Sequence, residues 1–135
     1  MTNHIPLVYI AGPYTAPEGH DYRGYHGIER NIGNARQVAA WLVDLGVYFF
    51  CPHLNSAHFE VIRPNAQPQY WYELDLRILR HCDAVLLIHG WRNSKGAVKE
   101  REVAIELGIP VFELAEEGAP MTAFFDFIHN FGGQE

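Results

Sequence analysis

Short apolar segments alternate along the chain with longer stretches in which apolar residues recur every three or four positions. The short segments are rich in β-branched and aromatic residues, which predicts strands at residues 7–11, 47–51, 84–88 and 109–112. The longer stretches predict amphipathic helices at residues 29–45, 68–81, 97–107 and 120–131. Two long loops are expected between these elements, at residues 12–28 and 53–67.

Strands that alternate with helices are typical of a parallel sheet with helices on both faces. Uninterrupted apolar strands support this, because such strands are buried on both sides. We therefore predict one α/β domain over residues 1–135, a doubly wound, flavodoxin- or Rossmann-like sheet of four or five strands in the order 2-1-3-4. Ligands bind such sheets where the strand order reverses, so residues 12–28 and 89–96 should border the crevice.

The charge balance bears on the choice of partner. The 135 residues include 16 acidic and 10 basic ones, which gives a net charge of −6. Proteins that bind duplexes usually show a basic excess, because phosphate neutralisation supplies much of their affinity. We therefore expect no nucleic-acid polymer as partner. A small anionic ligand stays open, because a few backbone amides can hold a phosphate.

Several features bear on the compartment. No apolar run is long enough to span a bilayer, and residues 1–4 do not begin a secretory signal. Cys51 and Cys82 each adjoin an apolar strand, which is typical of buried thiols in a reducing environment. We expect a cytoplasmic protein without a membrane partner.

Two carboxylates occupy positions where the helical pattern calls for apolar residues. Asp75 shares its stripe with Trp71, Leu74, Ile78 and Cys82, and Glu100 shares its stripe with Ala97, Ala104 and Leu107. A carboxylate on an apolar face must be paired, hydrogen-bonded or used in chemistry. The structural alternative is a buried acid that caps a loop or pairs with an arginine. Because both acids face the same predicted crevice, we favour chemistry.

The two acids differ in their predicted surroundings. Glu100 is expected in the first turn of its helix, where the helix dipole favours the ionised form and suits a nucleophile. Asp75 lies in mid-helix, where burial should raise its pKa and suit a proton donor. Two carboxylates with divided roles are the usual equipment for cleaving a glycosidic bond.

Other polar and aromatic residues surround the predicted crevice. Ser94 and Gly96 precede a helix, so they form either an N-cap or a site for a phosphate. His53 is expected as a polar group at the mouth of the crevice. Neither a dinucleotide fingerprint nor a Walker A loop is present, and the histidine spacings do not resemble a zinc site, so we expect no cofactor and no metal. Four aromatic residues either stack on a nucleobase or pack in the core: Tyr70, Trp71, Tyr72 and Trp91.

Taken in order, three motifs resemble the nucleoside 2-deoxyribosyltransferase-like superfamily over most of the chain. They are Val8-Tyr9-Ile10-Ala11-Gly12-Pro13-Tyr14, then Asp75-Leu76 with Cys82-Asp83, then Ser94-x-Gly96-x-x-x-Glu100-x-x-x-Ala104-x-x-x-Gly108-x-Pro110. The resemblance implies that Glu100 is the nucleophile and that Asp75 protonates the departing base. It also implies that Tyr9 lies beside the nucleophile, and that residues of the first loop, including Gly12 and Tyr14, contact the substrate.

Ser94 is the informative position within this superfamily. Transferases that act on free nucleosides tend to carry aspartate there, whereas the 2′-deoxynucleoside 5′-monophosphate N-hydrolases carry serine, which can bond a phosphate. His53 also matches a histidine of those hydrolases. Thr15 stands where they have arginine, so Arg23 or Arg30 would have to supply the charge. The overall pattern resembles most a group of small phage and bacterial proteins of unknown function.

These observations predict an N-glycosidase that hydrolyses the base–sugar bond of a 2′-deoxynucleoside 5′-monophosphate. One alternative is a 2-deoxyribosyltransferase that moves deoxyribose between bases, and another is a nucleotide-binding or sensing module without turnover. The resemblance further implies a homodimer or higher homo-oligomer. The Phe- and Met-rich residues 121–130 are the expected interface, with core packing as the alternative.

Overall fold

The computed structural model describes residues 4–14, 24–115 and 119–133, which form a parallel sheet flanked by helices. The strands are β1 (Leu7–Ala11), β2 (Tyr48–Phe50), β3 (Ala84–Leu87) and β4 (Val111–Glu113). Their spatial order is β2-β1-β3-β4, and β1 pairs with β2 through Val8 and Phe49 and with β3 through Val8 and Ala84. The predicted doubly wound α/β fold and strand order are confirmed.

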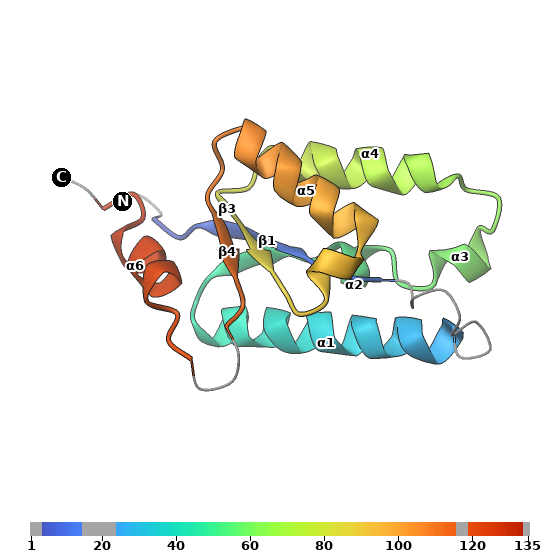
Figure 1. Cartoon of the computed structure of the whole chain (residues 1–135), viewed down its shortest axis with the longest axis horizontal. Coiled ribbons are helices and arrows are strands. Elements are labelled where there is room, and N and C mark those ends of the chain that lie inside the picture. The colour runs from blue at the N-terminus through green and yellow to red at the C-terminus, as the bar shows by residue number, and fades with distance from the viewer. Residues whose placement is uncertain (1–3, 15–23, 116–118, 134–135) are drawn as a thin grey trace.

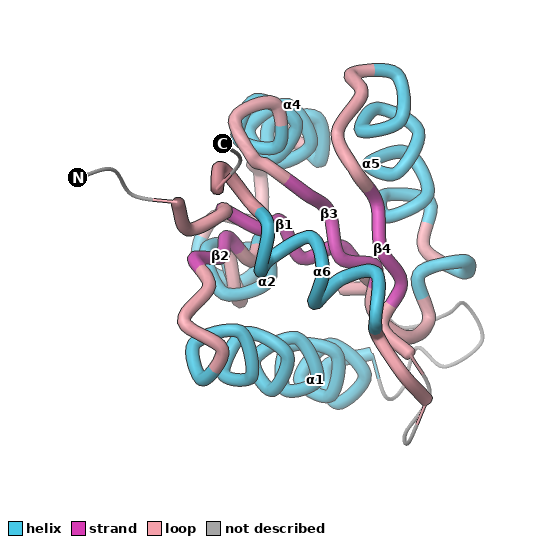
Figure 2. The backbone as a smooth tube through the Cα atoms, turned by 90° about the vertical axis from the view of Figure 1, so that its left-hand side faces the viewer, coloured by secondary structure: helices cyan, strands magenta, loops and turns pink. Residues whose placement is uncertain are grey.

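Six α-helices and a short 3-10 helix connect or follow the described strands. The helices are α1 (Gly24–Asp44), α2 (Pro52–Asn55), α3 (Phe59–Ile62), α4 (Pro68–Leu79), α5 (Lys95–Glu106) and α6 (Thr122–Asn130), and the 3-10 helix covers Trp91–Asn93. Figures 1 and 2 show α4 and α5 on one side of the sheet and α1 on the other. None of these helices is long and apolar enough to cross a membrane.

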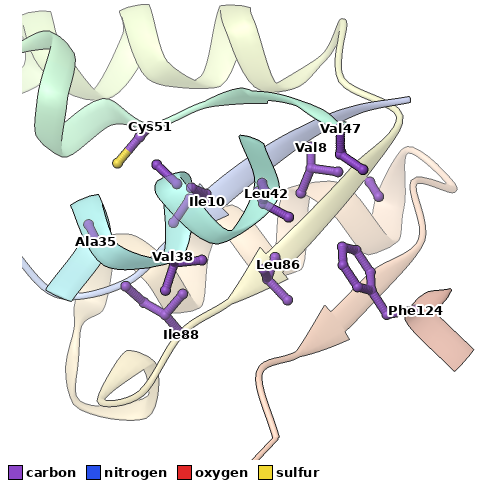
Figure 3. Packing of buried hydrophobic residues seen from close by; sticks show 12 residues of the cluster. Val8, Ile10, Ala35, Val38, Leu42, Val47, Cys51, Leu86, Ile88 and Phe124 are labelled. Atoms are coloured by element: carbon purple, nitrogen blue, oxygen red, sulfur yellow. The ribbon is translucent and has the colours of Figure 1, made fainter. Parts of the chain in front are cut away.

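The side chains of β1 divide between the two faces of the sheet because successive residues of a strand point in opposite directions. Val8 and Ile10 enter a hydrophobic cluster that includes Leu42 of α1, Leu86 of β3 and Phe124 of α6. Figure 3 shows these side chains packed against one another. Tyr9 and Ala11 point to the opposite face, where α4 and α5 cover the sheet. Tyr9 is therefore directed toward α5 by its register alone.

Some predicted boundaries are wrong. The first helix begins at Gly24, inside the segment predicted as a loop, and the predicted loop at 53–67 contains the single-turn helices α2 and α3. Pro52 occupies the first turn of α2, where its missing N–H costs nothing. Periods of 3.6 residues cannot be recognised in four-residue helices, which explains why the pattern missed them.

Two helix ends differ from their predicted stripes. Leu45 and Leu107 are exposed, because α1 ends at Asp44 and α5 at Glu106. Gly46 follows the end of α1 with a φ of 76°, which glycine adopts without strain. Asp83, just before β3, accepts a hydrogen bond from the backbone N–H of Leu7 at 2.8 Å.

The segment predicted as a subunit interface contributes to the hydrophobic core. Phe124 of α6 is 1% exposed, and its ring stacks on Trp41 at 5.9 Å and meets Phe112 edge-on at 5.3 Å. Phe127 is also partly buried against this cluster, whereas Phe125 is exposed. Core packing, the alternative explanation, thus accounts for much of the segment, and the oligomer stays a prediction. Both cysteines are buried free thiols, as predicted.

Candidate active site

A cleft of about 1150 Å³ opens beyond the C-terminal ends of β1 and β3, with walls from α3, α4 and the start of α5. This is the point at which the strand order reverses, where ligands bind in doubly wound sheets. The cleft brings together seven of the predicted site residues: Gly12, Tyr14, His53, Asp75, Ser94, Gly96 and Glu100. Tyr9 lies beneath it, fully buried.

Glu100 and Tyr9 form the best-defined contact of the cleft. The Tyr9 hydroxyl donates a hydrogen bond of 2.6 Å to Oε2 of Glu100, and the two residues are 91 positions apart in the sequence. Glu100 is 9% exposed and lines the cleft, so its carboxylate reaches the cavity from an otherwise apolar face of α5. The tyrosine holds this carboxylate in a fixed position, as the resemblance implied.

The protonation of Glu100 differs from the expectation. The pKa of the Glu100 carboxyl is raised to about 8, mainly by burial; the hydrogen bond from Tyr9 opposes this rise, and the nearby charge of Asp75 adds to it. The expected effect of the helix dipole is weak because α5 begins at Lys95, which leaves Glu100 beyond the first turn. The prediction of a readily ionised Glu100 is therefore wrong.

Asp75 faces the same cleft from α4. Burial raises the pKa of the Asp75 carboxyl to about 6, in the predicted direction. The Asp75 and Glu100 charges are close enough that the Asp75 carboxylate raises the pKa of Glu100. Like charges in one site resist joint ionisation, so the pair holds one proton readily near neutral pH.

Ser94 ends the short 3-10 helix and begins α5. Its Oγ accepts a hydrogen bond of 3.1 Å from the N–H of Ala97, which confirms the N-cap. The cap uses the oxygen as acceptor, so the hydroxyl hydrogen remains able to donate into the cleft. Gly96 has only the Ser94 Oγ, at 3.9 Å, within 4 Å of where a Cβ would lie among the described atoms. Packing therefore does not require glycine there, and its missing side chain leaves space beside the start of α5.

The loop after β1 is held in place from two sides. A Cβ on Gly12 would overlap with the side chain of Ile88, so the loop can approach the end of β3 only with glycine at this position. Nε2 of His53 lies 2.7 Å from the carbonyl oxygen of Pro13. Since a carbonyl only accepts, Nε2 carries the hydrogen. His53 lines the cleft, as predicted, but it is only 4% exposed and burial lowers its pKa, so it also supports the loop from within the wall.

Tyr14 connects three segments of the cleft wall. Its hydroxyl donates to Glu60 of α3 at 2.9 Å and accepts from the backbone N–H of His58 at 2.9 Å. Its carbonyl oxygen accepts from Nδ2 of Asn31 in α1 at 3.0 Å. Burial is the main reason why the pKa of Tyr14 is raised to about 12. Tyr14 therefore fixes α3 against α1 and the first loop.

The cationic side chains of the cleft were not predicted. Arg23 and Thr15 lie outside the described residues, and Arg30 is an exposed residue of α1 that does not line the cleft. Among the described arginine and lysine residues, Arg63 and Lys95 line it. Lys95 stands between Ser94 and Gly96 in the sequence, and this adjacency was a usable signal. Arg63 follows α3, in a segment whose course the pattern could not predict.

Metal ligation was expected to be absent. In the part of the chain that the structure describes, no three histidine, cysteine, aspartate or glutamate side chains are grouped so that they could hold a metal ion. The expectation that the site works without a metal or cofactor stays a prediction.

Together, the fold and the cleft define an α/β protein with two buried carboxylates at the switch point of a parallel sheet. The chain belongs to the family described as Domain of unknown function (DUF1937), which it matches over residues 6–116. Among solved structures, a 2-deoxyribosyltransferase from the psychrotolerant bacterium Bacillus psychrosaccharolyticus has a similar fold, with a TM-score of 0.53 and 20% sequence identity. That match covers 90% of this chain and 81% of the other. No curated protein matches the sequence.

The structural match confirms the predicted fold, which this chain shares with a solved 2-deoxyribosyltransferase. At this identity it concerns the arrangement of strands and helices. The chemistry of the cleft must therefore be argued from its own residues.

Proposed function

We propose that the protein is an N-glycosidase that hydrolyses the bond between base and sugar in a 2′-deoxynucleoside 5′-monophosphate. The observation that carries the proposal is the pair of carboxylates, Glu100 and Asp75, in one cleft with Tyr9 bonded to the first. A paired acid and nucleophile is the arrangement that glycosidic bonds require, because the departing group needs a proton and the anomeric carbon needs an electron pair.

In the first step, an oxygen of Glu100 forms a bond to C1′ while the bond from C1′ to the base nitrogen breaks. The electron pair leaves with the base, and Asp75 supplies the proton that makes the base neutral. In the second step, Asp75 accepts a proton from water, whose oxygen displaces Glu100 from C1′. The products are the free base and 2-deoxyribose 5-phosphate, and both carboxyl groups return to their starting forms.

The pKa values bear on which form of the pair reacts. The mechanism needs an ionised Glu100 and a protonated Asp75, whereas the pKa of Glu100, about 8, is higher than that of Asp75, about 6. The reactive form is thus the less populated of the two singly protonated forms. The Tyr9 hydroxyl favours it, because its hydrogen bond is strongest to a carboxylate. The reversed assignment, with Glu100 as the acid, is tested below.

Ser94, Gly96 and Lys95 support a 5′-phosphate in the substrate. The N-terminus of α5, a hydroxyl that can donate and a neighbouring ammonium group all favour an anion. An aspartate at position 94 would repel the phosphate, although it would cap the helix as well as serine does.

The test is the release of free base, measured by chromatography, from a panel of 2′-deoxynucleosides and their 5′-monophosphates. We expect release from a monophosphate, loss of release in Glu100→Gln, and a shift of preference toward free nucleosides in Ser94→Asp. Release from free nucleosides alone in the unaltered protein would contradict the phosphate assignment. Nucleotide binding without any release would contradict the glycosidase and support the sensing module.

Transfer of deoxyribose to a second base is the other candidate, favoured by the fold likeness to a protein described as a 2-deoxyribosyltransferase. The first step is the same, and a base replaces water in the second. Adding a different free base to the release assay separates the two. A new nucleotide that forms in place of 2-deoxyribose 5-phosphate would show transfer.

A further inference from the structure

The structure separates the aromatic residues that surround the site into two groups. Of the four considered from the sequence, Trp71 and Tyr72 line the cleft, and Tyr70 and Trp91 do not. Tyr70 is 60% exposed, and Trp91 packs against the cluster beneath α5 and lies 4.7 Å from the guanidinium of Arg92. Phe59 of α3 also lines the cleft.

The three tryptophans of the chain differ in what holds them. Trp41 packs against the hydrophobic cluster between the sheet and α1, and Trp91 packs against the cluster between the sheet and helices α4 and α5. Within the described residues, Trp71 belongs to neither cluster. Its neighbours are two other rings, Phe59 with centroids 5.2 Å apart at 63° and Tyr70 at 4.8 Å and 84°. Trp71 therefore does not serve the core, and its place in the cleft wall needs another explanation.

The position of Trp71 on α4 supplies that explanation. Residues four apart on a helix lie on the same face, so Trp71 lies one turn before Asp75, and Tyr72 lies three residues before it. All three line the cleft. Under the proposed function, Asp75 gives its proton to the base, so the base must lie beside this part of α4. A base bound there can contact the Asp75 carboxyl and also the ring of Trp71, which lies one helical turn away on α4.

We propose that Trp71, with Tyr72, forms the subsite for the base, on which a planar heteroaromatic ring stacks. The inference rests on the proposed function, and it fixes the direction of the substrate: the base lies along α4, and the phosphate lies toward Ser94 on α5. Base stacking on an aromatic side chain is worth about 1–3 kcal/mol and tolerates different bases, because each has a π-face. The subsite therefore gives affinity to purines and pyrimidines alike.

The experiment measures binding separately from turnover, in a Glu100→Gln background. Adenine, guanine, cytosine, thymine and 2-deoxyribose 5-phosphate are each titrated by calorimetry, and the tightest-binding base is carried forward. Trp71→Ala should weaken its binding by about 5- to 150-fold, the equivalent of the stacking energy, and leave the binding of 2-deoxyribose 5-phosphate unchanged. The matched control is Trp91→Phe, which alters a tryptophan outside the cleft and should change neither.

A second measurement keeps the proposal testable if Trp71→Ala does not fold. The base should quench tryptophan fluorescence in the unaltered protein and in Trp91→Phe, and this quenching should be lost in Trp71→Phe. The proposal is overturned if no base binds, if quenching survives in Trp71→Phe, or if Trp71→Ala weakens base and sugar phosphate equally. Base binding through Trp71 without any base release would leave this subsite standing and remove the proposed hydrolysis.

Discussion

The two faces of the sheet are built from the same strands, but one contributes mainly to the hydrophobic core and the other also supports the cleft. On the face covered by α1 and α6, here called the lower face, these helices pack on Val8, Ile10 and Leu86 in a wholly apolar cluster. On the opposite or upper face, α4 and α5 pack on Tyr9 and Val85, and the carboxyl groups of Asp75 and Glu100 extend from these helices into the cleft. The lower face stabilises the fold, whereas burying two ionisable carboxyl groups on the upper face lowers the stability of the folded protein. Function is therefore concentrated in alternate residues of one strand and in the helices they face.

The largest effect that would sharpen this contrast is the loss of the proton donor. Asp75→Asn should lower turnover of a nucleotide by about 10²–10⁴-fold, the usual contribution of general acid catalysis. A 2-deoxyribosyl 5-phosphate with a p-nitrophenolate leaving group needs no proton in the first step, so Asp75→Asn should retain most of the rate of p-nitrophenolate release in the first turnover. The second step should still be slow, because Asp75 also accepts the proton from water. Glu100→Gln should lose both activities. If Glu100→Gln is rescued instead, Glu100 is the acid and the roles must be exchanged.

The complementary change lies on the lower face. Phe124→Ala should lower the free energy of unfolding by about 3–5 kcal/mol, because it leaves a cavity between Trp41 and Phe112. Turnover by the folded protein should stay within about twofold, since Phe124 does not line the cleft. Urea unfolding and steady-state kinetics below the melting temperature check both parts. A large loss of turnover with little loss of stability would break the division between the faces.

Because an ionised Glu100 is unfavourable in its buried position, removing this charge should raise the free energy of unfolding. The pKa of Glu100 is raised from about 4.5 to about 8 on folding, so between these pH values the folded chain keeps a proton that the unfolded chain has lost. Stability should then fall as pH rises through this window. Glu100→Gln should remove that contribution and raise the free energy of unfolding at pH 8, measured in urea, by up to about 5 kcal/mol, with a smaller gain at pH 5. An equal gain at both pH values would contradict a pKa-based cost.

The smallest predicted effect concerns the hydroxyl that links the strand to the cleft. The profile of kcat/KM against pH should be a bell with limbs near pH 6 and pH 8, which belong to the coupled pair. The Tyr9 hydrogen bond lowers the pKa of Glu100, so Tyr9→Phe should move the alkaline limb upward and lower the plateau by about tenfold per pKa unit. A lower plateau with unmoved limbs would assign Tyr9 a purely structural role.

The fold was predictable because its signals are local. Apolar runs in 7–11 and 84–88 and the alternation of strands with helices determine the sheet and its order. The single-turn helices α2 and α3 are too short for a periodic signal and were missed.

The site was predictable in its members but not in its energetics. Glu100 and Asp75 were recognisable because they interrupt apolar stripes, and Tyr9 only through a resemblance, since its partner lies 91 residues away. The pKa of Glu100 depends on how deeply α5 packs, and the role of His53 depends on a carbonyl 40 residues distant. Both the pKa of Glu100 and the role of His53 depend on tertiary packing, which is why the ionised Glu100 predicted from the sequence was wrong.

In the proposed mechanism Glu100 forms a covalent bond to the sugar, and rapid quenching followed by peptide mass spectrometry detects that bond. The protein is mixed with the 2′-deoxynucleoside 5′-monophosphate that it cleaves fastest, quenched in acid within milliseconds and digested. We predict a 2-deoxyribosyl 5-phosphate adduct on the peptide that contains Glu100, absent from Glu100→Gln. An adduct on the peptide that contains Asp75, or turnover with no adduct on either, would contradict the claim.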